Sequence, residues 1–498
     1  MINFSTYEVG AVLDGKLLIG GKWKTCDRKF ESLNPATGNI IGKACNAGSE
    51  EVTEAVKEAK LARESWNKID ISERAKIFIK IGDELLKRSQ EIKNLITMEM
   101  GRPLFESNIE VHKTSEMVKY FANEGKTFLE GDAIPINPYN FSFTRFEPVG
   151  VVGIIKPWNY PLLLPFWAIA PALIAGNTVV FKPSDLTPFV GIEIGKICQD
   201  AGIPYGVINI VTGDGFTGEC LVSSDIDMIS FTGSSDTGKN IMKNSADKLH
   251  RISLELGGSD AFIVFKDADI EEAINGAVWG RFMNCGQVCV SSKRIFVEDD
   301  IADSFIEGFV KKTRNLVIGN GLDPGTDIGP MVSIKQREKL ELQVEDAIRK
   351  GAIIECGGKN PLSLQDGFYY EPTVLTGVTP EMSVMNEEVF GPVAVISVFE
   401  NMDEAIALAN RTIYGLGASV WTKNLDTAMR MSSQLECGIV WVNEICTLHP
   451  QCPWGGIKHS GMGKDLSRYG IREFVSIKHV NINFGTDKTR PWWFPYGK

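Results

Sequence analysis

Histidine is scarce in this sequence, which has only five among 498 residues. None of them lies at a metal-ligand spacing from a second ligand, whereas zinc sites draw on closely spaced His and Cys side chains. We therefore predict that the protein has neither a structural nor a catalytic metal. Blocks of Lys and Arg are also missing. The formal net charge of -11 argues against a surface that binds nucleic acid.

Long apolar runs are missing as well. The longest, residues 162–175, contains Pro165 and Pro171 and falls short of the roughly 20 residues that a membrane helix needs. The N-terminus lacks the basic and then apolar pattern of a secretory signal. Ten cysteines are present without paired spacing, so we expect free thiols in a reducing compartment. These absences predict a cytoplasmic protein that does not contact membranes.

The length of the chain predicts two or three domains. Residues 15–45 alternate in the manner of short strands and hairpins, and residues 50–100 have helical periodicity. Strand and helix signals alternate after residue 149, which predicts a parallel, doubly wound α/β sheet. We expect strands at 149–155, 178–181, 207–211 and 228–231, helices at 169–175 and 190–201, and a second α/β unit over about 262–456.

Two segments do not fit a domain core. Residues 131–148 are rich in proline, asparagine and aromatic residues, which predicts a linker or an exposed hairpin. The chain ends in an alternating segment, 474–480, and in an aromatic tail from Pro491 to Tyr496. Exposed apolar surface of this size needs a cover, and a neighbouring subunit would supply one.

Three short segments combine the groups that carbonyl chemistry requires. Cys289 follows Gly286 and Gln287, and a thiol is well suited to attack a carbonyl because a few per cent is thiolate at neutral pH. Glu255 stands between leucines, which disfavours its charged form and suits a general base. Asn159 lies among aromatic residues and prolines and can donate a hydrogen bond to an oxyanion. Nucleophile, base and oxyanion donor together predict a site for carbonyl chemistry.

These segments, in this order, resemble the aldehyde dehydrogenase superfamily, whose members oxidise aldehydes to carboxylic acids with NAD or NADP. The resemblance extends from Asn34-Pro35-Ala36-Thr37-Gly38 to Pro453-Trp454-Gly455-Gly456. It implies an α/β fold with a Rossmann-type cofactor domain, an α/β catalytic domain and a small oligomerisation arm. The implied bounds are 1–130 and 149–260 for the NAD(P)-binding domain, 261–459 for the catalytic domain, and 131–148 with 473–498 for the arm and tail. A homo-oligomer, either a dimer or a tetramer, is expected.

The resemblance also implies a mechanism. The Cys289 thiolate attacks the aldehyde, and the Asn159 amide and the Cys289 main-chain N–H hold the oxyanion. Glu255 then activates the water that hydrolyses the thioester. The CoA-acylating branch lacks that glutamate, so its presence favours the free acid over a CoA thioester. An inert structural protein on the same fold is the alternative from another class, and retention of all three groups argues against it. Cys285 is interpreted as a packing residue, with a resolving thiol as the alternative.

The segments expected to bind the cofactor differ in how specific their sequence patterns are. Gly213 to Gly218 fits G-x-G-x-x-G, which alone is equally a glycine-rich turn. The turn after Phe231 is a better phosphate site, because Ser234 and free N–H groups stand at a helix start. Family members that use NAD usually have Glu at the position of Asp185, so the choice between NAD and NADP stays open. The residues expected to bind the cofactor are Ile155, Pro157, Trp158, Lys182, Ser184, Asp185, Gly213, Gly218, Phe231, Gly233, Ser234, Leu256, Gly257, Glu388 and Phe390.

The substrate is the least determined feature. By resemblance, Tyr160, Trp167, Met283 and Trp454 line the aldehyde tunnel. Three of them resemble the aromatic box of betaine-aldehyde and aminoaldehyde dehydrogenases, but Met283 replaces an aromatic residue found there. The semialdehyde branch has Arg where Trp167 stands, which argues against succinate semialdehyde. Arg281 and His449 are expected near the mouth, where they would bind a hydroxyaldehyde such as glyceraldehyde. We predict an aliphatic or hydroxyaldehyde substrate, with betaine aldehyde or an aminoaldehyde as the alternative.

Overall fold

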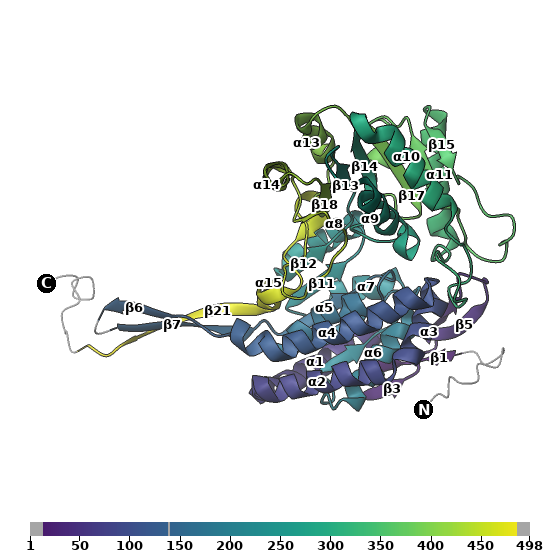
Figure 1. The fold of residues 1–498 in the computed structure, drawn as a ribbon. Helices are drawn as coiled ribbons and strands as arrows, with labels where there is room; N and C mark the ends of the chain where they lie inside the picture. Colours follow the sequence, from purple (N-terminus) through teal and green to yellow (C-terminus); the bar gives the residue numbers. More distant parts are fainter. Residues whose placement is uncertain (1–12, 138–139, 486–498) are drawn as a thin grey trace.

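Two large β-sheets, a three-stranded sheet near the N-terminus and a protruding three-stranded arm organise the chain in the computed structural model, which describes residues 13–137 and 140–485 (Figure 1). The N-terminal region forms the predicted short strands: β1 (Leu13–Gly15), β2 (Leu17–Ile19), β3 (Lys22–Lys24), β4 (Lys29–Leu33) and β5 (Ile40–Cys45). Four helices follow: α1 (Ser49–Lys68), α2 (Ile71–Lys87), α3 (Ser89–Met100) and α4 (Leu104–Phe128). Helix α1 buries Val52, Ala55 and Ala59, as its apolar periodicity predicts.

The larger sheet has eight strands in the order β20-β12-β11-β8-β9-β10-β2-β3. The predicted parallel strands are β8 (Val151–Ile155), β9 (Thr178–Lys182), β10 (Ile208–Ile210) and β11 (Met228–Thr232), and they are joined by β12 (Arg251–Glu255) and the short β20 (Gly461–Met462). The connecting helices are α5 (Leu163–Ile174), α6 (Pro188–Asp200), α7 (Gly215–Val222) and α8 (Ser235–Ser245), with a 3-10 turn at Ala246–Lys248. The doubly wound α/β prediction is confirmed.

Helix α5 is longer than predicted. The sequence indicates a helix over 169–175, whereas α5 begins at Leu163 and contains both Pro165 and Pro171. Every residue of α5 is buried, so its sequence has no polar face and therefore no helical period to detect. Pro165 lies in the first turn, where the missing N–H has no helical partner in any case.

The order of the strands defines a functional edge. Strand β8 lies between β9 and β11: the chain runs from β8 outward to β9 and β10 and then returns to β11 on the other side of β8. Strands β8, β9, β11 and β12 run parallel, and their carboxyl ends therefore lie at one edge. Ligands of open α/β sheets bind outside the carboxyl ends at such a switch point. Most of the predicted cofactor residues lie at or just after these strand ends.

The second sheet has seven strands in the order β15-β16-β17-β14-β13-β18-β19. Its strands are β13 (Asp260–Val264), β14 (Ser292–Glu298), β15 (Ile353–Cys356), β16 (Thr373–Thr376), β17 (Val393–Phe399), β18 (Gly417–Trp421) and β19 (Ile439–Val442). Its helices are α9 (Ile270–Phe282), α10 (Ala302–Arg314), α11 (Ile334–Arg349), α12 (Ser383–Asn386), α13 (Met402–Asn410) and α14 (Leu425–Gln434). Short 3-10 turns are found at Met283–Gly286, Asp299–Ile301 and Lys458–Ser460, and α15 (Ser467–Glu473) completes the body.

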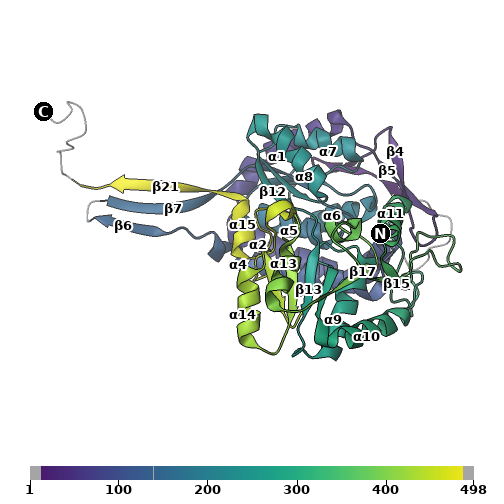
Figure 2. The ribbon, with the colours of Figure 1, turned by 90° about the horizontal axis from the view of Figure 1, so that it is seen from above.

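An antiparallel sheet of three strands extends from the body as an arm (Figures 1 and 2). It consists of β6 (Ala133–Asn137), β7 (Asn140–Pro148) and β21 (Val475–Asn483), in the order β21-β7-β6. Of the two alternatives predicted for residues 131–148, a linker or an exposed hairpin, the structure has the hairpin. The aromatic tail from Pro491 to Tyr496 lies outside the described residues. Within the described ranges, no helix has both the length and the apolar character that a membrane span requires.

Candidate active site

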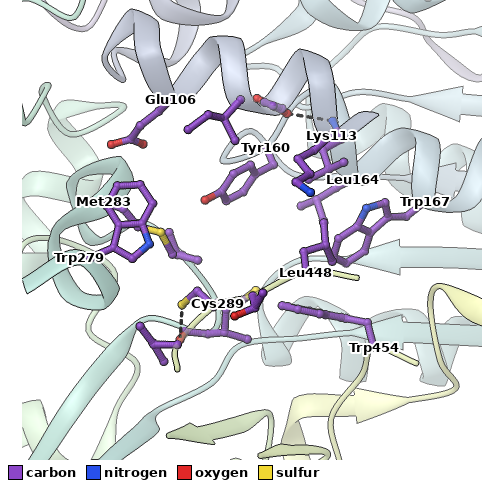
Figure 3. Close-up of a pocket in the computed structure, with 18 of the residues that line it drawn as sticks. Glu106, Lys113, Tyr160, Leu164, Trp167, Trp279, Met283, Cys289, Leu448 and Trp454 are labelled. Atoms are coloured by element: carbon purple, nitrogen blue, oxygen red, sulfur yellow. Dashed lines mark hydrogen bonds between the residues drawn. The ribbon is translucent and has the colours of Figure 1, made fainter. Parts of the chain in front are cut away.

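A cavity of about 370 Å³ lies between α4, α5 and the loops of the second sheet (Figure 3), within the size range of small-molecule sites. Cys289 lines one wall. The four predicted substrate residues line it as well: Tyr160, Trp167, Met283 and Trp454. Trp167 and Trp454 lie on one side and Met283 with Trp279 on the other. The structure thus brings residues from four distant segments around one cavity.

Cys289 lies in the loop that joins α9 to β14. The backbone turns tightly before it, with positive φ angles at Asn284, Cys285 and Gly286. A Cβ at Gly286 would clash with the carbonyl oxygen of Gly391, so only glycine fits there. Cys285 is 2% exposed and packs in the core, away from the cavity lining. The loop therefore exposes one thiol to the cavity and buries the other.

Asn159 is fixed against the same loop. Its side-chain Nδ2 donates to the carbonyl oxygen of Gln287 at 3.1 Å. Its own carbonyl oxygen accepts from Arg102 at 3.1 Å and from the side chain of Asn284 at 3.0 Å. The Asn159 side chain is 4% exposed, so its orientation is set by these contacts. One N–H of the amide remains for a further acceptor.

Glu255 is the last residue of β12, and its side chain is buried. Neither carboxylate oxygen has a hydrogen-bond partner among the described residues. Burial raises the pKa of Glu255 well above its ordinary value, the nearby Asp465 carboxyl raises it further, and Lys464 and Lys156 oppose the shift. A Cβ at Gly455 would clash with Glu255 Oε1. Glu255 is thus a buried, unpaired acid-base group, as its leucine neighbours predict.

The acidity of Cys289 differs from the sequence-based expectation. Burial raises the pKa of its thiol to about 12, and Lys293 is the largest influence that opposes the shift. The thiol therefore carries its proton at neutral pH, and the expectation of a few per cent thiolate is wrong for this setting. Attack on an aldehyde consequently requires a group that accepts the proton.

The edge of the first sheet holds the predicted cofactor residues. Lys182 ends β9 and is 6% exposed, and its ammonium group has no hydrogen-bond or ion-pair partner among the described residues. Burial lowers its pKa. Ser184 is buried, and its hydroxyl lies 3.3 Å from the carboxylate of the exposed Asp185. A buried, unpaired ammonium beside a hydroxyl and a carboxylate suits the hydroxyls of a bound sugar.

Two helix starts lie along the same edge. Ser234 caps α8, where its hydroxyl accepts from the N–H of Thr237 at 3.3 Å. Asp214 caps α7, so the G-x-G-x-x-G segment has the strand-turn-helix context that the pattern requires. Gly218 lies inside α7, and a Cβ there would be 4.0 Å from the side chains of Ile155 and Lys182. The N-termini of these helices fit an anionic pyrophosphate.

Glu388 and Phe390 lie where the two sheets meet. Glu388 Oε1 accepts from the N–H of Gly258 at 3.1 Å, and a Cβ at Gly257 would clash with Glu388 Oε2. Phe390 packs edge-on against Trp158 with ring centroids 5.5 Å apart. Leu256 is buried and stands in the chain between Glu255 and Gly257. The remaining cofactor candidates adjoin the same edge: Pro157 precedes Trp158, and Phe231 and Gly233 precede Ser234.

Arg281, which is predicted to lie at the mouth of the cavity, does not line it. Arg281 is fully buried and donates to the carbonyl oxygens of Val389, Gly391 and Val393 and to the Ser291 hydroxyl. A charged residue at the end of α9 looks solvated in the sequence, but here it satisfies carbonyl groups of an irregular loop. His449 is exposed and lines the cavity, as expected.

Sequence reasoning missed several polar groups of the site. Arg102 and Glu110 form a buried ion pair, and the Arg102 guanidinium lies 4.5 Å from the centroid of the Tyr160 ring. Glu106 accepts from the N–H of Asn284 at 2.9 Å, and burial raises its pKa to about 7. Lys113 on α4 also lines the cavity (Figure 3), and its Nζ donates to the carboxylate of Glu116 at 2.9 Å. The apolar spacing of α4 gives no signal for these residues.

Comparisons with known proteins agree with this geometry. The model of the aldehyde dehydrogenase family matches residues 23–480. Betaine aldehyde dehydrogenase of Bacillus subtilis is 40% identical over 477 residues, which cover 94% of this chain and 97% of that protein. Sheep (Ovis aries) aldehyde dehydrogenase 1A1 is 40% identical over 480 residues and 94% of each chain. The NAD⁺ complex of an aldehyde dehydrogenase from Bacillus cereus superposes with a TM-score of 0.93 at 37% identity, over 95% of this chain and 97% of that one.

Proposed function

The chain belongs to the aldehyde dehydrogenase family, and we propose that it oxidises a small aldehyde to the free carboxylic acid through Cys289. As a family member it is an NAD(P)-dependent oxidoreductase. One observation carries the proposed mechanism: a cavity-lining thiol lies in the same loop that binds the Asn159 amide. This arrangement pairs a nucleophile with an oxyanion donor.

In the proposed reaction, Cys289 Sγ bonds to the aldehyde carbon and gives a thiohemiacetal. The thiol proton passes to a base, and Glu255 suits this role because its carboxylate is buried without a hydrogen-bond partner among the described residues and burial raises its pKa, which makes it a stronger base. The free N–H of Asn159 and the main-chain N–H of Cys289 stabilise the oxyanion. The nicotinamide of a bound cofactor supplies the hydride acceptor. Glu255 first releases the thiol proton to solvent. It then takes a proton from the water molecule that attacks the Cys289 thioester, and it passes this proton to the departing Cys289 sulfur, so that the acid and the thiol are released.

We assign the cofactor contacts by residue type. Ser234 and the start of α8 would bind a pyrophosphate oxygen. Lys182 and Asp185 would bind the adenosine ribose, where the short Asp185 side chain leaves room for a 2′-phosphate. Glu388 would hold the nicotinamide ribose, and Phe390 would press on the ring. The unpaired Lys182 ammonium and the capped helix starts support this assignment.

For the substrate we favour an uncharged aliphatic or hydroxyaldehyde. Two positive groups occupy the lining: Lys113, whose Nζ donates to Glu116 at 2.9 Å, and Arg102, which pairs with Glu110 and lies 4.5 Å from the centroid of the Tyr160 ring. They leave less room for a cationic substrate group on this side of the cavity. Trp167 and Trp454 contact each other edge-on with centroids 5.2 Å apart, so a trimethylammonium group does not fit between them. His449 at the mouth suits a substrate hydroxyl.

Betaine aldehyde or an aminoaldehyde is the second candidate. The aromatic walls formed by Tyr160, Trp167 and Trp454 support it, because indole and phenol rings attract cations. Glu106 adds a carboxyl group to the lining. The name of the Bacillus subtilis relative points the same way.

We further propose that the protein is a homo-oligomer in the cytoplasm, either a dimer or a tetramer. The arm carries exposed Ile136, Phe141 and Ile477, and a second copy would cover them. All ten cysteines are unpaired, which suits a reducing compartment.

Replacement of the nucleophile tests the mechanism. Cys289→Ala should abolish cofactor reduction with every aldehyde while the thermal unfolding temperature stays within a few degrees of the parent. Cys452→Ala removes an exposed thiol and should leave the rate unchanged. Full activity in Cys289→Ala would overturn the mechanism.

A further inference from the structure

Lys293 is a buried lysine whose ammonium group contacts the loop between α9 and β14, which carries the proposed nucleophile Cys289. Its Nζ donates to the carbonyl oxygens of Val288 at 2.9 Å and Cys289 at 2.6 Å. Glu388 Oε1 lies 3.7 Å from the same nitrogen, and the Lys293 side chain is 0% exposed. An ammonium group has three N–H donors. Two of them are used by carbonyl groups next to the nucleophile, and Glu388 forms an ion pair with the same ammonium.

Asp260 completes the surroundings of Lys293. It starts β13, which pairs with β14, the strand of Lys293. Its side chain is 2% exposed, and neither carboxylate oxygen has a hydrogen-bond partner among the described residues. Burial raises the pKa of Asp260 to about 7, and Lys293 is the largest influence that lowers it. A buried ammonium group such as that of Lys293 is costly unless neighbouring groups compensate its charge. The nearby carboxyl groups of Asp260 and Glu388 therefore belong to the surroundings that allow Lys293 to be buried here.

The hydrogen bonds of Lys293 hold the main chain of Cys289 on both sides. The carbonyl of Val288 and the N–H of Cys289 belong to one planar peptide unit, in which they point in opposite directions. A contact that fixes the Val288 carbonyl therefore also fixes the direction of the Cys289 N–H, the group assigned to the oxyanion. The bond to the Cys289 carbonyl fixes the next peptide plane.

The charge of Lys293 acts on the thiol as well. Lys293 is the only positive group among the main influences on the pKa of Cys289. Asp260, Glu388 and Glu255 are the negative ones, and the Cys446 thiol lines the same cavity. A nearby cation favours the thiolate, whereas nearby carboxylates favour the thiol.

We propose that Lys293 is a positioning residue that orients the Cys289 main chain and stabilises the Cys289 thiolate. This inference rests on the proposed role of Cys289 as the nucleophile. Two separate consequences follow for the reaction. The N–H of Cys289 is held ready for the oxyanion, and a larger fraction of the thiol ionises at a given pH.

Alkylation of Cys289 by iodoacetamide tests the second consequence without any turnover. Lys293→Met keeps the length of the side chain and removes its charge. We expect its rate of Cys289 alkylation, followed by peptide mass over pH 7–10, to be at least about tenfold lower at each pH. Lys335→Met, an exposed lysine on α11, should match the parent. A Lys293→Met rate equal to the parent's at every pH would overturn the proposal.

A second pair of variants covers the case in which Lys293→Met does not fold because Asp260 loses its counter-charge. Asp260→Asn and the double variant Asp260→Asn/Lys293→Met both lack the buried carboxylate. The double variant should alkylate Cys289 about tenfold more slowly than Asp260→Asn, and equal rates would overturn the proposal. Activity retained by Cys289→Ala would instead refute the nucleophile assignment, so the two failures are distinguishable.

Discussion

The side-chain Nδ2 of Asn159 lies 3.1 Å from the carbonyl oxygen of Gln287, two residues before Cys289. This hydrogen bond links the segment after β8, in the first sheet, to the loop before β14, in the second. It uses one of the two N–H groups of the amide and directs the other. The oxyanion donor and the nucleophile are thereby held in one unit although 128 positions separate the bonded residues.

Replacement of the oxyanion donor should slow chemistry without weakening the fold. We expect Asn159→Ala to reduce kcat by about 10²–10³-fold, the usual effect of losing one such donor. Asn159→Asp keeps the shape but has no N–H to donate, so its loss should be at least as large. Steady-state rates with a saturating aldehyde measure the effect. Rates within twofold of the parent in both variants would remove Asn159 from the mechanism.

The thiol of Cys289 should behave as a weak acid in the enzyme without cofactor or aldehyde. Its pKa of about 12 places neutral pH far below the midpoint, so the thiolate fraction should rise about tenfold per pH unit. The rate at which iodoacetamide alkylates Cys289 should accordingly continue to increase through pH 10. A plateau near pH 9, the behaviour of an ordinary cysteine, would show that burial does not control this group.

The length of the acidic side chain at position 185 should set cofactor preference. Asp185 is exposed after β9, and Asp185→Glu extends its carboxylate by one methylene. The longer side chain reaches both ribose hydroxyls and repels a 2′-phosphate, so kcat/KM for NAD relative to NADP should rise about tenfold. Initial rates with each dinucleotide measure the ratio. An unchanged ratio would place the ribose elsewhere.

The charge at the cavity mouth should select the aldehyde. The parent should prefer glyceraldehyde or propanal over betaine aldehyde, because two positive residues, Lys113 and Arg102, line the cavity. Lys113→Glu reverses one of these charges and should raise kcat/KM for betaine aldehyde relative to glyceraldehyde by about tenfold. Lys126→Glu lies on the same helix outside the lining and serves as the control. A parent that already prefers betaine aldehyde would favour the cation-binding alternative.

Much of the fold was predictable because its strands follow local rules. Strands β8, β9 and β11 are short apolar runs bounded by glycine or proline, and alternation with helices implies a parallel sheet. Helix α5 was only partly predictable, since a helix that is buried on every side has no amphipathic period. The arm hairpin was recognisable because its composition does not suit a core.

The proposed reactive residues could be recognised from their residue types, whereas the residues that hold the surrounding main chain in place could not. Cys289, Glu255 and Asn159 are unusual residue types in apolar surroundings, and their order in the chain resembles a known family. Lys293 and Arg281 are charged residues that sequence patterns assign to the surface. The main-chain carbonyl partners of Arg281 are more than 100 positions away in the chain. Those of Lys293 are four and five positions away, but they belong to an irregular loop whose conformation no local pattern predicts.

The most direct test of the central claim is a pre-steady-state measurement on Glu255→Gln. If Glu255 activates the water that hydrolyses the Cys289 thioester, this variant should still form the thioester but release acid slowly. We predict a burst of reduced cofactor of about one equivalent per active site, followed by a steady rate at least about 10²-fold below that of the parent. Mass spectrometry should then find the acyl group on Cys289. A parent-like steady rate without a trapped acyl group would contradict the account.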